Sequence, residues 1–510
     1  MHFEVYIWFN LFFTKVFCLF MHIENTALKK ILPLIYVNLE IQVMPFKYLF
    51  SKGKQLQSLT DATIQSLTNV TESIITYTWK EIASLFGLQD DIYKNPLHKP
   101  LEKPVKAILI GAGNRGNTYA DYALLHPDEL NIVGVADGNA IRNGRFARKH
   151  SVDAVNRFYA WEQVFEREKF ADAVIIATPD NIHAAPCLRA LEKGYDVLLE
   201  KPIAPTEEEC RLILNTAKAK GRIVGVCHVL RYSPYFRQLK HIIESKTIGD
   251  VVSIQHLEPI EAIHMAHSYV RGNWRNSKET SPIVLAKSCH DTDIIRWLIN
   301  EPAEYIQCFG GLNLFKIENA PEGSTERCID GCAVESTCPF SALQIYYRDR
   351  KRGYVFDLPK DSRKAGKVIL KKLATTNYGR CVYRMDNDQP DHLTINMQFK
   401  NNITAAFSME AFTSYEGRFT RVMGTRGDIV GDMESYTITD FKTGKETSWS
   451  LKTDYHGGGD HRLVKDWVQA VGHRDAAILS SLIDVSVESH LMAFAAERSR
   501  LSRTIEKIIV

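Results

Sequence analysis

The sequence lacks several features that would assign it to a broad class at once. Its formal net charge is only +3 over 510 residues, so the composition gives no reason to expect a nucleic-acid partner or an acidic membrane surface. Its ten cysteines are scattered rather than placed at the spacings of a disulfide framework, which predicts a reducing, cytoplasmic environment. Internal repeats and low-complexity tracts are absent from the sequence. With 45% hydrophobic and 24% charged residues, the chain is long enough for two or more domains with full cores.

A hydrophobic run long enough to span a membrane is also missing. The N-terminal segment is apolar, but Glu4 and Lys15 limit its uninterrupted stretch to about ten residues, short of the roughly twenty that a span needs. The positive first segment and small-residue cleavage site of a secretory signal are not evident. We interpret residues 1–102 as an N-terminal extension and linker, with Met21 or Met44 as candidate later starts. A membrane-proximal anchor is the alternative.

A glycine-rich turn follows the first clear strand pattern. Residues 105–110 have the pattern of a short buried strand and run directly into the motif G-x-G-x-x-G. In this context glycines allow a tight turn, close approach of a pyrophosphate and close helix packing, while N–H groups of the following helix can bind phosphate. The motif contains five candidate cofactor-binding residues, Gly111, Gly113, Asn114, Arg115 and Gly116.

Asp137 indicates which dinucleotide to expect. It ends a second strand pattern, residues 131–136, and lies 21 residues beyond Gly116, near the spacing at which a carboxylate binds the adenosine ribose hydroxyls. Its negative charge would repel a 2′-phosphate, so the sequence predicts NAD. Arg142 nearby keeps NADP possible.

Three further strand patterns alternate with helical patterns and complete most of a Rossmann domain, residues 103–228. They lie at 173–177, 196–200 and 222–226. Ligands of doubly wound sheets bind outside the carboxyl ends of the strands. The residues that follow each strand are therefore candidates for contact with the cofactor.

Two of these strand ends carry distinctive residues. Thr178 and Pro179 suit a loop over the nicotinamide ribose, and His183 either contacts the cofactor or begins the next helix. Glu200 and Lys201 end another strand, directly before a proline. This position directs Lys201 toward the cofactor crevice.

These motifs together resemble those of the Gfo/Idh/MocA oxidoreductase family, which includes glucose-fructose oxidoreductase and inositol dehydrogenase. The resemblance covers residues 103–510 and rests on the glycine turn, Asp137, Ala177-Thr178-Pro179, Glu200-Lys201-Pro202 and Cys289-His290-Asp291. It implies an α/β Rossmann domain followed by an α+β domain, residues 229–510, with a large and mostly antiparallel open sheet. It also implies a homo-oligomer, a dimer or tetramer, formed through that sheet.

The resemblance further implies hydride transfer between a nicotinamide and a secondary alcohol of a sugar, cyclitol or related polyol. Oxidising such an alcohol requires a base poised near neutral pH. Burial beside a cationic nicotinamide would weaken the hold of Lys201 on its proton, and the family assigns this lysine to binding and proton transfer, with Glu200 orienting it. Two alternatives stay open: a redox-neutral enzyme that cleaves or eliminates glycosides by transient oxidation, and a non-catalytic NAD-binding regulator.

A second group of candidates opens a later helical pattern. His290 is expected as a catalytic residue, with a helix-capping histidine as the alternative. Many relatives keep an aspartate four residues earlier, but that position is Ala286 here, which puts the usual proton relay in doubt. Lys287 could act as a second base or bind a substrate oxyanion. Asp291 and Asp293 are expected to cap the helix or orient its first turn.

Three more residues are candidates for substrate binding. His228 and Arg231 follow the last Rossmann strand, and Arg231 either grips substrate oxygens or forms a structural salt bridge. His456 lies in a glycine-rich stretch, residues 456–461, that either folds over the pocket or forms a loop before a helix.

The second domain shows mainly strand patterns. Strands are predicted at 251–257, 305–309, 392–399, 403–409 and 419–423, with a hairpin turn at 401–402, and helices at 234–245, 290–300, 461–471 and 487–507.

Three cysteines, Cys328, Cys332 and Cys338, mark an insert at 316–367, and Cys381 is a possible fourth member of the group. Their spacing is not a standard zinc or ferredoxin pattern, and a fourth ligand must come from a distance. Three interpretations stay open: reduced cysteines that order the loop, a structural zinc or cluster site, and a disulfide. A catalytic role is not expected, because the nicotinamide carries the redox step. We expect the insert to shape substrate specificity.

Overall fold

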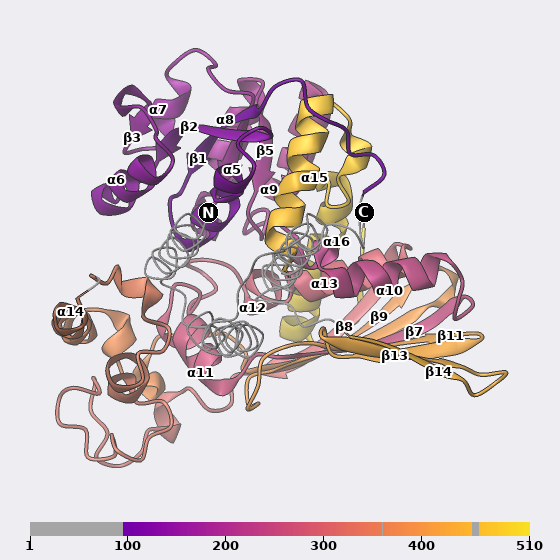
Figure 1. The fold of residues 1–510 in the computed structure, drawn as a ribbon. Helices are drawn as coiled ribbons and strands as arrows, with labels where there is room; N and C mark the ends of the chain where they lie inside the picture. Colours follow the sequence, from indigo (N-terminus) through magenta and orange to yellow (C-terminus); the bar gives the residue numbers. More distant parts are fainter. Residues whose placement is uncertain (1–94, 360, 451–457, 510) are drawn as a thin grey trace, which may run out of the picture. The chain divides into compact units, whose positions relative to one another are not determined.

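The computed structural model describes residues 95–359, 361–450 and 458–509, which all belong to one compact unit (Figure 1). Two sheets organise this unit, a parallel one in the first domain and a larger mixed one in the second. Across the described ranges, no helix is long and apolar enough to cross a membrane.

The first domain is built on a six-stranded parallel sheet in the order β3-β2-β1-β4-β5-β6. This is a doubly wound order, as suits the predicted Rossmann domain, and the five predicted strands are confirmed. The sixth, β3, was missed because two residues are too few for a periodic pattern. Every residue of β4 and β5 is buried, as central strands covered on both faces require. The strands are β1 (Val105–Ile110), β2 (Leu130–Ala136), β3 (Arg157–Phe158), β4 (Ala173–Ile176), β5 (Asp196–Leu199) and β6 (Val224–Val226).

Helices alternate with these strands, and local sequence sets their ends. The Thr206 side chain accepts from the N–H of Glu209 and begins α9, while Gly221, with φ of 58°, ends it in the left-handed conformation. The Thr206 hydroxyl also donates to the Glu209 carboxylate at 3.0 Å. The helices are α4 (Asn114–Ala120), α5 (Tyr122–Leu125), α6 (Ala140–Lys149), α7 (Glu162–Phe165), α8 (Ala184–Glu192) and α9 (Glu207–Lys220).

The C-terminal part of the chain completes the core of the first domain. Helix α15 (Gly459–His473) lies beside the first domain, as Figure 1 shows in yellow. Its Trp467 is fully buried, and the indole N–H donates to the carbonyl oxygen of Val197 in β5 at 3.1 Å. The N–H of Val226 in β6 donates to the carbonyl oxygen of Ser481 at 2.9 Å. Residues far apart in the sequence therefore share one hydrophobic core.

The second domain is built on a nine-stranded sheet in the order β14-β13-β12-β11-β7-β10-β9-β8-β15. Only β7 and β10 pair in parallel, so the sheet is mostly antiparallel, as expected. Asn401 and Asn402, both with positive φ, turn the chain between β9 and β10, which confirms the predicted hairpin. The strands are β7 (Val251–Pro259), β8 (Ala303–Gly311), β9 (His392–Phe399), β10 (Thr404–Glu410), β11 (Phe419–Gly424), β12 (Gly427–Gly431), β13 (Ser435–Asp440), β14 (Glu446–Ser450) and β15 (Glu506–Lys507).

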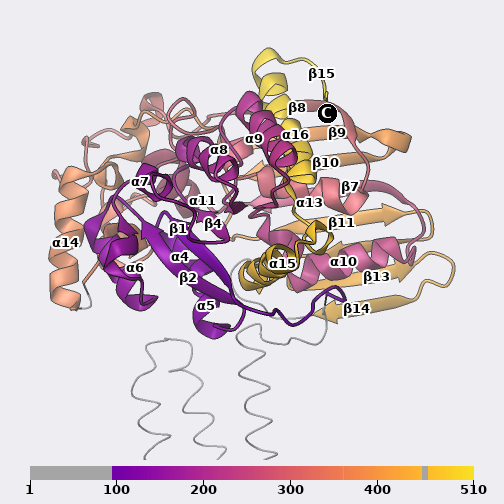
Figure 2. The ribbon, with the colours of Figure 1, turned by 90° about the horizontal axis from the view of Figure 1, so that it is seen from above.

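Three helices lie over one face of this sheet, α10 (Pro234–Glu244), α13 (Cys289–Ile299) and α16 (Ile483–Ser502) (Figure 2). The predicted helix at 487–507 extends too far. Arg503 adopts the left-handed conformation and ends α16, and the chain then pairs with β8 as the short strand β15.

The chain between β8 and β9 forms the cysteine-containing insert. Residues of its turns and helices pack into a small core of their own, which includes Tyr346, Phe356 and Ile369. The longest element is α14 (Ser362–Thr375). On the other side of β8 in sequence, a short run of helices leads toward α13, namely α11 (Ala262–Met265), the π-helical turn η4 (Ala266–Arg271) and α12 (Ile283–Ala286).

Candidate active site

The glycine turn lies at the carboxyl end of β1 and leaves its backbone open at one point. Gly111 has φ of +95°, and a Cβ there would lie 2.5 Å from the carbonyl oxygen of Ala177. A Cβ at Gly116 would overlap the carbonyl oxygen of Gly111, so α4 packs closely on the turn. At Gly113, by contrast, a Cβ would meet no described atom within 4 Å. Because a pyrophosphate needs such an open backbone surface, the turn fits a dinucleotide.

Asp137 ends β2 beside this turn. One carboxylate oxygen accepts from the N–H of Ala112 at 2.8 Å and the other from the N–H of Asn139 at 2.7 Å. The Arg142 guanidinium lies 3.4 Å from the same carboxylate. The charge is therefore fixed at the edge of the glycine turn, a position that fits binding of the adenosine ribose.

Arg115 and Glu200, both expected to contact the cofactor, bind each other. Arg115 Nε donates to Glu200 Oε1 at 2.9 Å, and its Nη2 donates to Asp460 at 2.5 Å. The Tyr119 hydroxyl also donates to Glu200, at 2.8 Å. Burial would raise the pKa of Glu200, but Arg115 and Lys201 hold that pKa below its usual range. Glu200 touches Lys201 through the backbone N–H of the lysine, so it anchors the strand end rather than the ammonium.

The ammonium of Lys201 binds a main-chain oxygen instead. Its Nζ donates to the carbonyl oxygen of Ala286 at 2.7 Å. Ala286 is the last residue of α12, where the family pattern would place an aspartate. This contact brings the carboxyl end of β5 against the segment that carries Lys287 and His290.

His183 joins two loops on the cofactor side of the sheet. It is fully buried, with Nδ1 2.6 Å from the carbonyl oxygen of Pro202 and Nε2 2.9 Å from that of Thr178. Both ring nitrogens therefore face the main chain. Pro179 follows Thr178 and precedes a 3-10 turn, η2 (Asp180–Ile182), as suits a loop over the nicotinamide ribose.

A buried group of charged residues lies behind Lys287. Lys287 Nζ is 3.1 Å from Glu258 Oε1, and Arg418 Nη2 donates to the same oxygen at 2.7 Å. Arg418 Nε also donates to Asp291 at 2.7 Å, and His256 Nε2 lies 3.0 Å from Asp291. We call these five residues the Glu258 cluster.

The two carboxyl groups of the Glu258 cluster differ in their affinity for protons. Burial and then the nearby Asp291 raise the pKa of Glu258 to about 7, against the effects of Lys287 and Arg418. Burial alone would also raise the pKa of Asp291, but Arg418 and His256 hold it well below its usual range. Two buried acids separate in this way because ionising both is unfavourable. Glu258 is therefore able to exchange a proton near neutral pH beside Lys287.

Asp291 and Asp293 do not cap α13, which was one of the two roles expected of them. The helix begins after Ser288 with no hydrogen bond from a capping side chain. Asp291 instead binds Arg418, and Asp293 binds Arg231. Both carboxylates are fully buried, where an ionised acid has to be paired.

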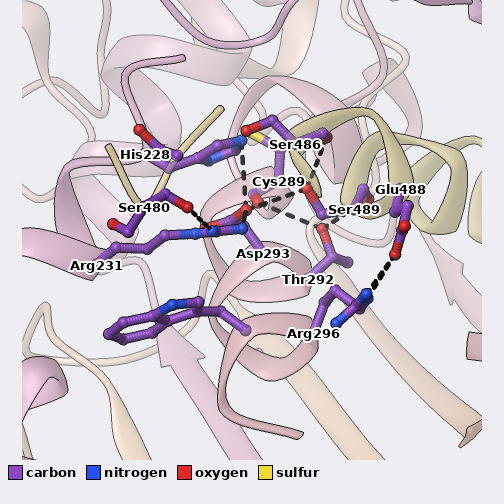
Figure 3. A network of polar contacts seen from close by, with 12 residues as sticks. His228, Arg231, Cys289, Thr292, Asp293, Arg296, Ser480, Ser486, Glu488 and Ser489 are labelled. Atoms are coloured by element: carbon purple, nitrogen blue, oxygen red, sulfur yellow. Dashed lines mark hydrogen bonds and ion pairs between the residues drawn. The ribbon is translucent and has the colours of Figure 1, made fainter. Parts of the chain in front are cut away.

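Arg231 belongs to a buried polar network that also includes residues from α13 and α16 (Figure 3). Its Nε and Nη2 donate to the two oxygens of Asp293 at 2.7 and 2.6 Å, and its Nη1 donates to the carbonyl oxygen of Ser480. Ser489 Oγ donates to Asp293 as well, at 3.2 Å. With 1% of its surface exposed, Arg231 forms the structural salt bridge that was one of the two roles expected of it.

His228 is fully buried in the same network, with Nε2 3.5 Å from Asp293. Burial and then neighbouring cations hold its pKa well below the ordinary value, so the ring is neutral. It packs edge-on against His290 and His490, with ring centroids 6.2 and 5.5 Å apart. Because no surface of His228 is exposed, direct substrate binding is not supported, and the residue supports His290 instead.

The glycine-rich stretch before α15 is described only from Gly458 onward, and His456 lies outside the described residues. Asp460 binds Arg115, and His461 Nε2 lies 3.2 Å from the carbonyl oxygen of Thr118 in α4. The start of α15 therefore contacts the helix that follows the glycine turn.

Glu258, Arg418 and His256 were missed by the sequence interpretation. One signal was present, because Glu258 follows directly on a predicted apolar strand and ends β7 beside a proline. Its partner Arg418 is 160 positions away, and no single sequence can pair residues at that separation.

The sheet order, the open glycine turn, Asp137 beside it and Lys201 at the end of β5 together define an NAD-binding oxidoreductase. Two family models match the chain. Residues 105–228 match the oxidoreductase family's NAD-binding Rossmann fold, and residues 240–485 match the same family's C-terminal alpha/beta domain. The chain therefore belongs to the Gfo/Idh/MocA oxidoreductase family, as the resemblance indicated.

Individual relatives are distant. "Putative oxidoreductase YteT" of Bacillus subtilis is 26% identical over 318 residues, 58% of this chain and 71% of the relative. Inositol 2-dehydrogenase 1 of Saccharopolyspora erythraea is 29% identical over 170 residues, 33% of this chain and 47% of the relative. The 2,7-anhydro-N-acetylneuraminate hydratase of Escherichia coli is 25% identical over 207 residues, 40% of this chain and 52% of the relative. This chain thus spans about half the length of the last two.

A solved structure shares the fold. It is an inositol dehydrogenase homolog from Azotobacter vinelandii, complexed with NADH and myo-inositol. Its TM-score is 0.58 at 16% identity, with 81% of this chain and 99% of that chain covered. At this identity the likeness concerns the fold, which matches the predicted Rossmann and open-sheet domains.

Proposed function

We propose that this protein is an NAD(P)-dependent dehydrogenase acting on a secondary alcohol of a sugar, cyclitol or related polyol. The observation that carries the proposal is the position of Lys201. It lies at the carboxyl end of β5, which is separated from β1 and its glycine turn by β4 alone. Its Nζ lies 2.7 Å from the Ala286 carbonyl oxygen. A nicotinamide dinucleotide held at the glycine turn and Asp137 would supply the hydride acceptor or donor.

The residues of the chain divide the remaining work. The Ala286 carbonyl fixes the direction of the Lys201 amine, which takes the hydroxyl proton as the hydride leaves the carbinol carbon. Lys287, 3.1 Å from Glu258, offers a cation for a neighbouring substrate oxygen. His290 packs against the neutral His228 ring and supplies a further polar group for the substrate.

Glu258 supplies a buried carboxyl group beside Lys287, the residue that follows Ala286. It binds Lys287, and the Ser288 hydroxyl donates to its second oxygen at 3.3 Å. We infer that Glu258 holds the Lys287 ammonium in place. It is a positioning residue, because its side chain is 1% exposed and acts through the lysine.

A lysine substitution tests the proposal. Lys201→Met should retain NAD binding and lose about 100-fold to 10,000-fold in turnover, the usual contribution of a positioned acid or base. The exposed Lys193→Met variant is the matched control and should turn over normally. Reduced-cofactor absorbance with a panel of sugars and cyclitols is the assay. Full turnover by Lys201→Met would contradict the proposed role of Lys201, whereas NAD binding by a wild type that turns over no substrate would favour a non-catalytic regulator.

Redox-neutral chemistry is the second candidate. The distant likeness to a 2,7-anhydro-N-acetylneuraminate hydratase and the alanine at position 286 favour it. The two candidates separate in one experiment: a dehydrogenase produces reduced cofactor in step with substrate loss. A redox-neutral enzyme consumes a glycoside or anhydro-sugar while the reduced-cofactor signal stays flat.

We also propose a homo-oligomer formed through the second sheet, in a reducing compartment such as the cytoplasm. Described cysteines are free thiols, which suits such a compartment. Large apolar side chains alternate with core residues along the strands and remain 41–50% exposed on the face opposite the core. They are Val252, Tyr305, Phe309, Phe419 and Val430. Apolar patches of this kind mark protein interfaces.

A further inference from the structure

Four cysteines meet around one small cavity in the insert. Cys328, Cys332, Cys338 and Cys381 all line it and are free thiols. The interior has room for about one water-sized species. We propose that this cavity is a structural metal site, in which the four cysteine sulfurs bind one Zn²⁺ ion.

The backbone brings two of these cysteines together from distant parts of the insert. An antiparallel β-bridge joins the residues that precede Cys328 and Cys381. The N–H of Cys328 donates to the carbonyl oxygen of Gly379 at 3.0 Å, and the N–H of Cys381 donates to that of Glu326 at 2.9 Å. The missing fourth ligand that the sequence spacing required is therefore supplied by Cys381.

Arg271 indicates that the cavity suits a negatively charged assembly. It lines the cavity at 1% exposure, and its Nη2 lies 3.7 Å from Cys328 Sγ. Nε and Nη2 donate to the carbonyl oxygens of Arg380 and Phe340, both at 2.8 Å, while Nη1 has no hydrogen-bond partner in the described part of the chain. A buried guanidinium needs an anion. Four thiolates around Zn²⁺ carry net negative charge, which Arg271 would offset.

Zinc binding at the cavity exchanges protons for the metal. On binding, each thiol releases its proton to solvent as its sulfur bonds to the metal, so no oxidant or reductant takes part. The site is therefore expected to fill more completely as pH rises.

Filling the site requires the thiols to turn inward. Within the described residues, no three cysteine, histidine, aspartate or glutamate side chains are already arranged to hold a metal ion. Cys332 and Cys338 lie outside any helix or strand, and both side chains are partly exposed. Loop-rich segments with small cores often depend on such a metal for their stability.

The metal would fix the insert against the substrate domain. Arg271 belongs to η4, which also carries His267, and His267 Nδ1 lies 2.7 Å from the Tyr346 hydroxyl in the insert core. We therefore assign the Zn²⁺ ion a structural role, in which it cross-links loops of the insert, and no part in hydride transfer. This inference does not depend on the proposed reaction.

The first test is elemental analysis of the full chain. The protein is purified with a thiol reductant and dialysed against a mild chelator before the measurement. The expected result is about one zinc per chain in the wild type and in the control variant Cys308→Ser, whose thiol lies in β8 outside the cavity. Cys332→Ser and Cys381→Ser should lose most of the metal while NAD binding, followed by fluorescence, shows that the first domain stays folded.

A second measurement uses the wild type alone, so it does not depend on the folding of variants. Co²⁺ exchanged into the site should show the intense near-ultraviolet charge-transfer band and visible bands of tetrahedral cobalt–thiolate. Zinc-free protein with four freely reactive thiols would overturn the assignment. So would iron with inorganic sulfide, or a disulfide between any two of the four cysteines.

Discussion

Replacing Glu258 with glutamine should remove a pH dependence that the Glu258 cluster imposes on stability. In the wild type, burial and Asp291 raise the pKa of Glu258 from 4.5 to about 7. An acid whose pKa is raised by folding stabilises the fold while it holds its proton. That contribution is present below the unfolded pKa and is lost as pH rises through the folded pKa. The relevant window therefore runs from 4.5 to about 7.

The size of the pKa shift sets the size of the effect. At about 1.4 kcal/mol per pH unit, a rise from 4.5 to about 7 corresponds to a loss of about 3 kcal/mol across this window. Glutamine resembles the protonated acid and cannot ionise, so the variant lacks this loss. The stability advantage of the wild type over Glu258→Gln should therefore shrink by about 3 kcal/mol between roughly pH 4.5 and pH 7.5.

Thermal unfolding across this pH range is the assay, and the quantity of interest is the difference in Tm between wild type and variant. For a chain of this size the expected change in that difference is a few degrees, at about 2 °C per kcal/mol or less. Glu244→Gln is the matched control, because its carboxylate is 63% exposed and pairs with Lys240 at the surface. A Tm difference for Glu258→Gln that stays constant with pH would refute the reasoning.

Three further substitutions address other parts of the molecule. Asp137→Ala should weaken NAD binding about 10-fold to 100-fold, because hydrogen bonds to a charged group are lost. The variant should weaken NADP binding less. Equal losses of affinity for NAD and NADP, measured by calorimetry, would contradict a contact between Asp137 and the ribose. Arg231→Met leaves Asp293 buried and unpaired and should destabilise the protein by about 3–5 kcal/mol with NAD affinity unchanged. A stable Arg231→Met variant with a raised KM would restore the substrate-binding role. Phe309→Glu places a charge on the open sheet face and should yield monomers by light scattering, whereas an unchanged mass would remove this face from the interface.

Periodicity predicted most of the buried strands and missed the exposed ones. The strands of the first sheet other than β3, together with β7 to β11, were recognised because their residues alternate or run apolar against a core. The buried strand β12 was also missed, because its five residues include two glycines and only two large apolar side chains. Strands β13 and β14 form the outer edge of the second sheet, and most of their residues are partly or fully exposed. Without a buried face there is no hydrophobic pattern to detect.

The residues of the candidate site could be predicted where a polar or charged side chain directly follows a recognisable strand. Lys201 and Asp137 were found in this way, and the structure places both at the carboxyl edge of the first sheet. The acceptor of Lys201 could not be found, because it is a main-chain oxygen and position 286 carries only a methyl group. The salt bridge of Arg231 depends on a partner 62 positions away, so sequence alone left its role open.

The contribution of α15 and of the residues after it to the first domain has a consequence for how the protein is made. Trp467 binds the main chain of β5, and Ser481 and Leu482 pair with β6. The Rossmann core is therefore incomplete until these residues have been synthesised. Domains generally fold as units and N-terminal ones first during synthesis. We therefore expect the nascent first domain to stay incomplete until these residues are made, with apolar surface on β5 and β6 exposed. A truncation shortly before Gly459 removes residues that belong to the second domain by sequence. It would nevertheless damage the cofactor domain, because those residues pack in its core.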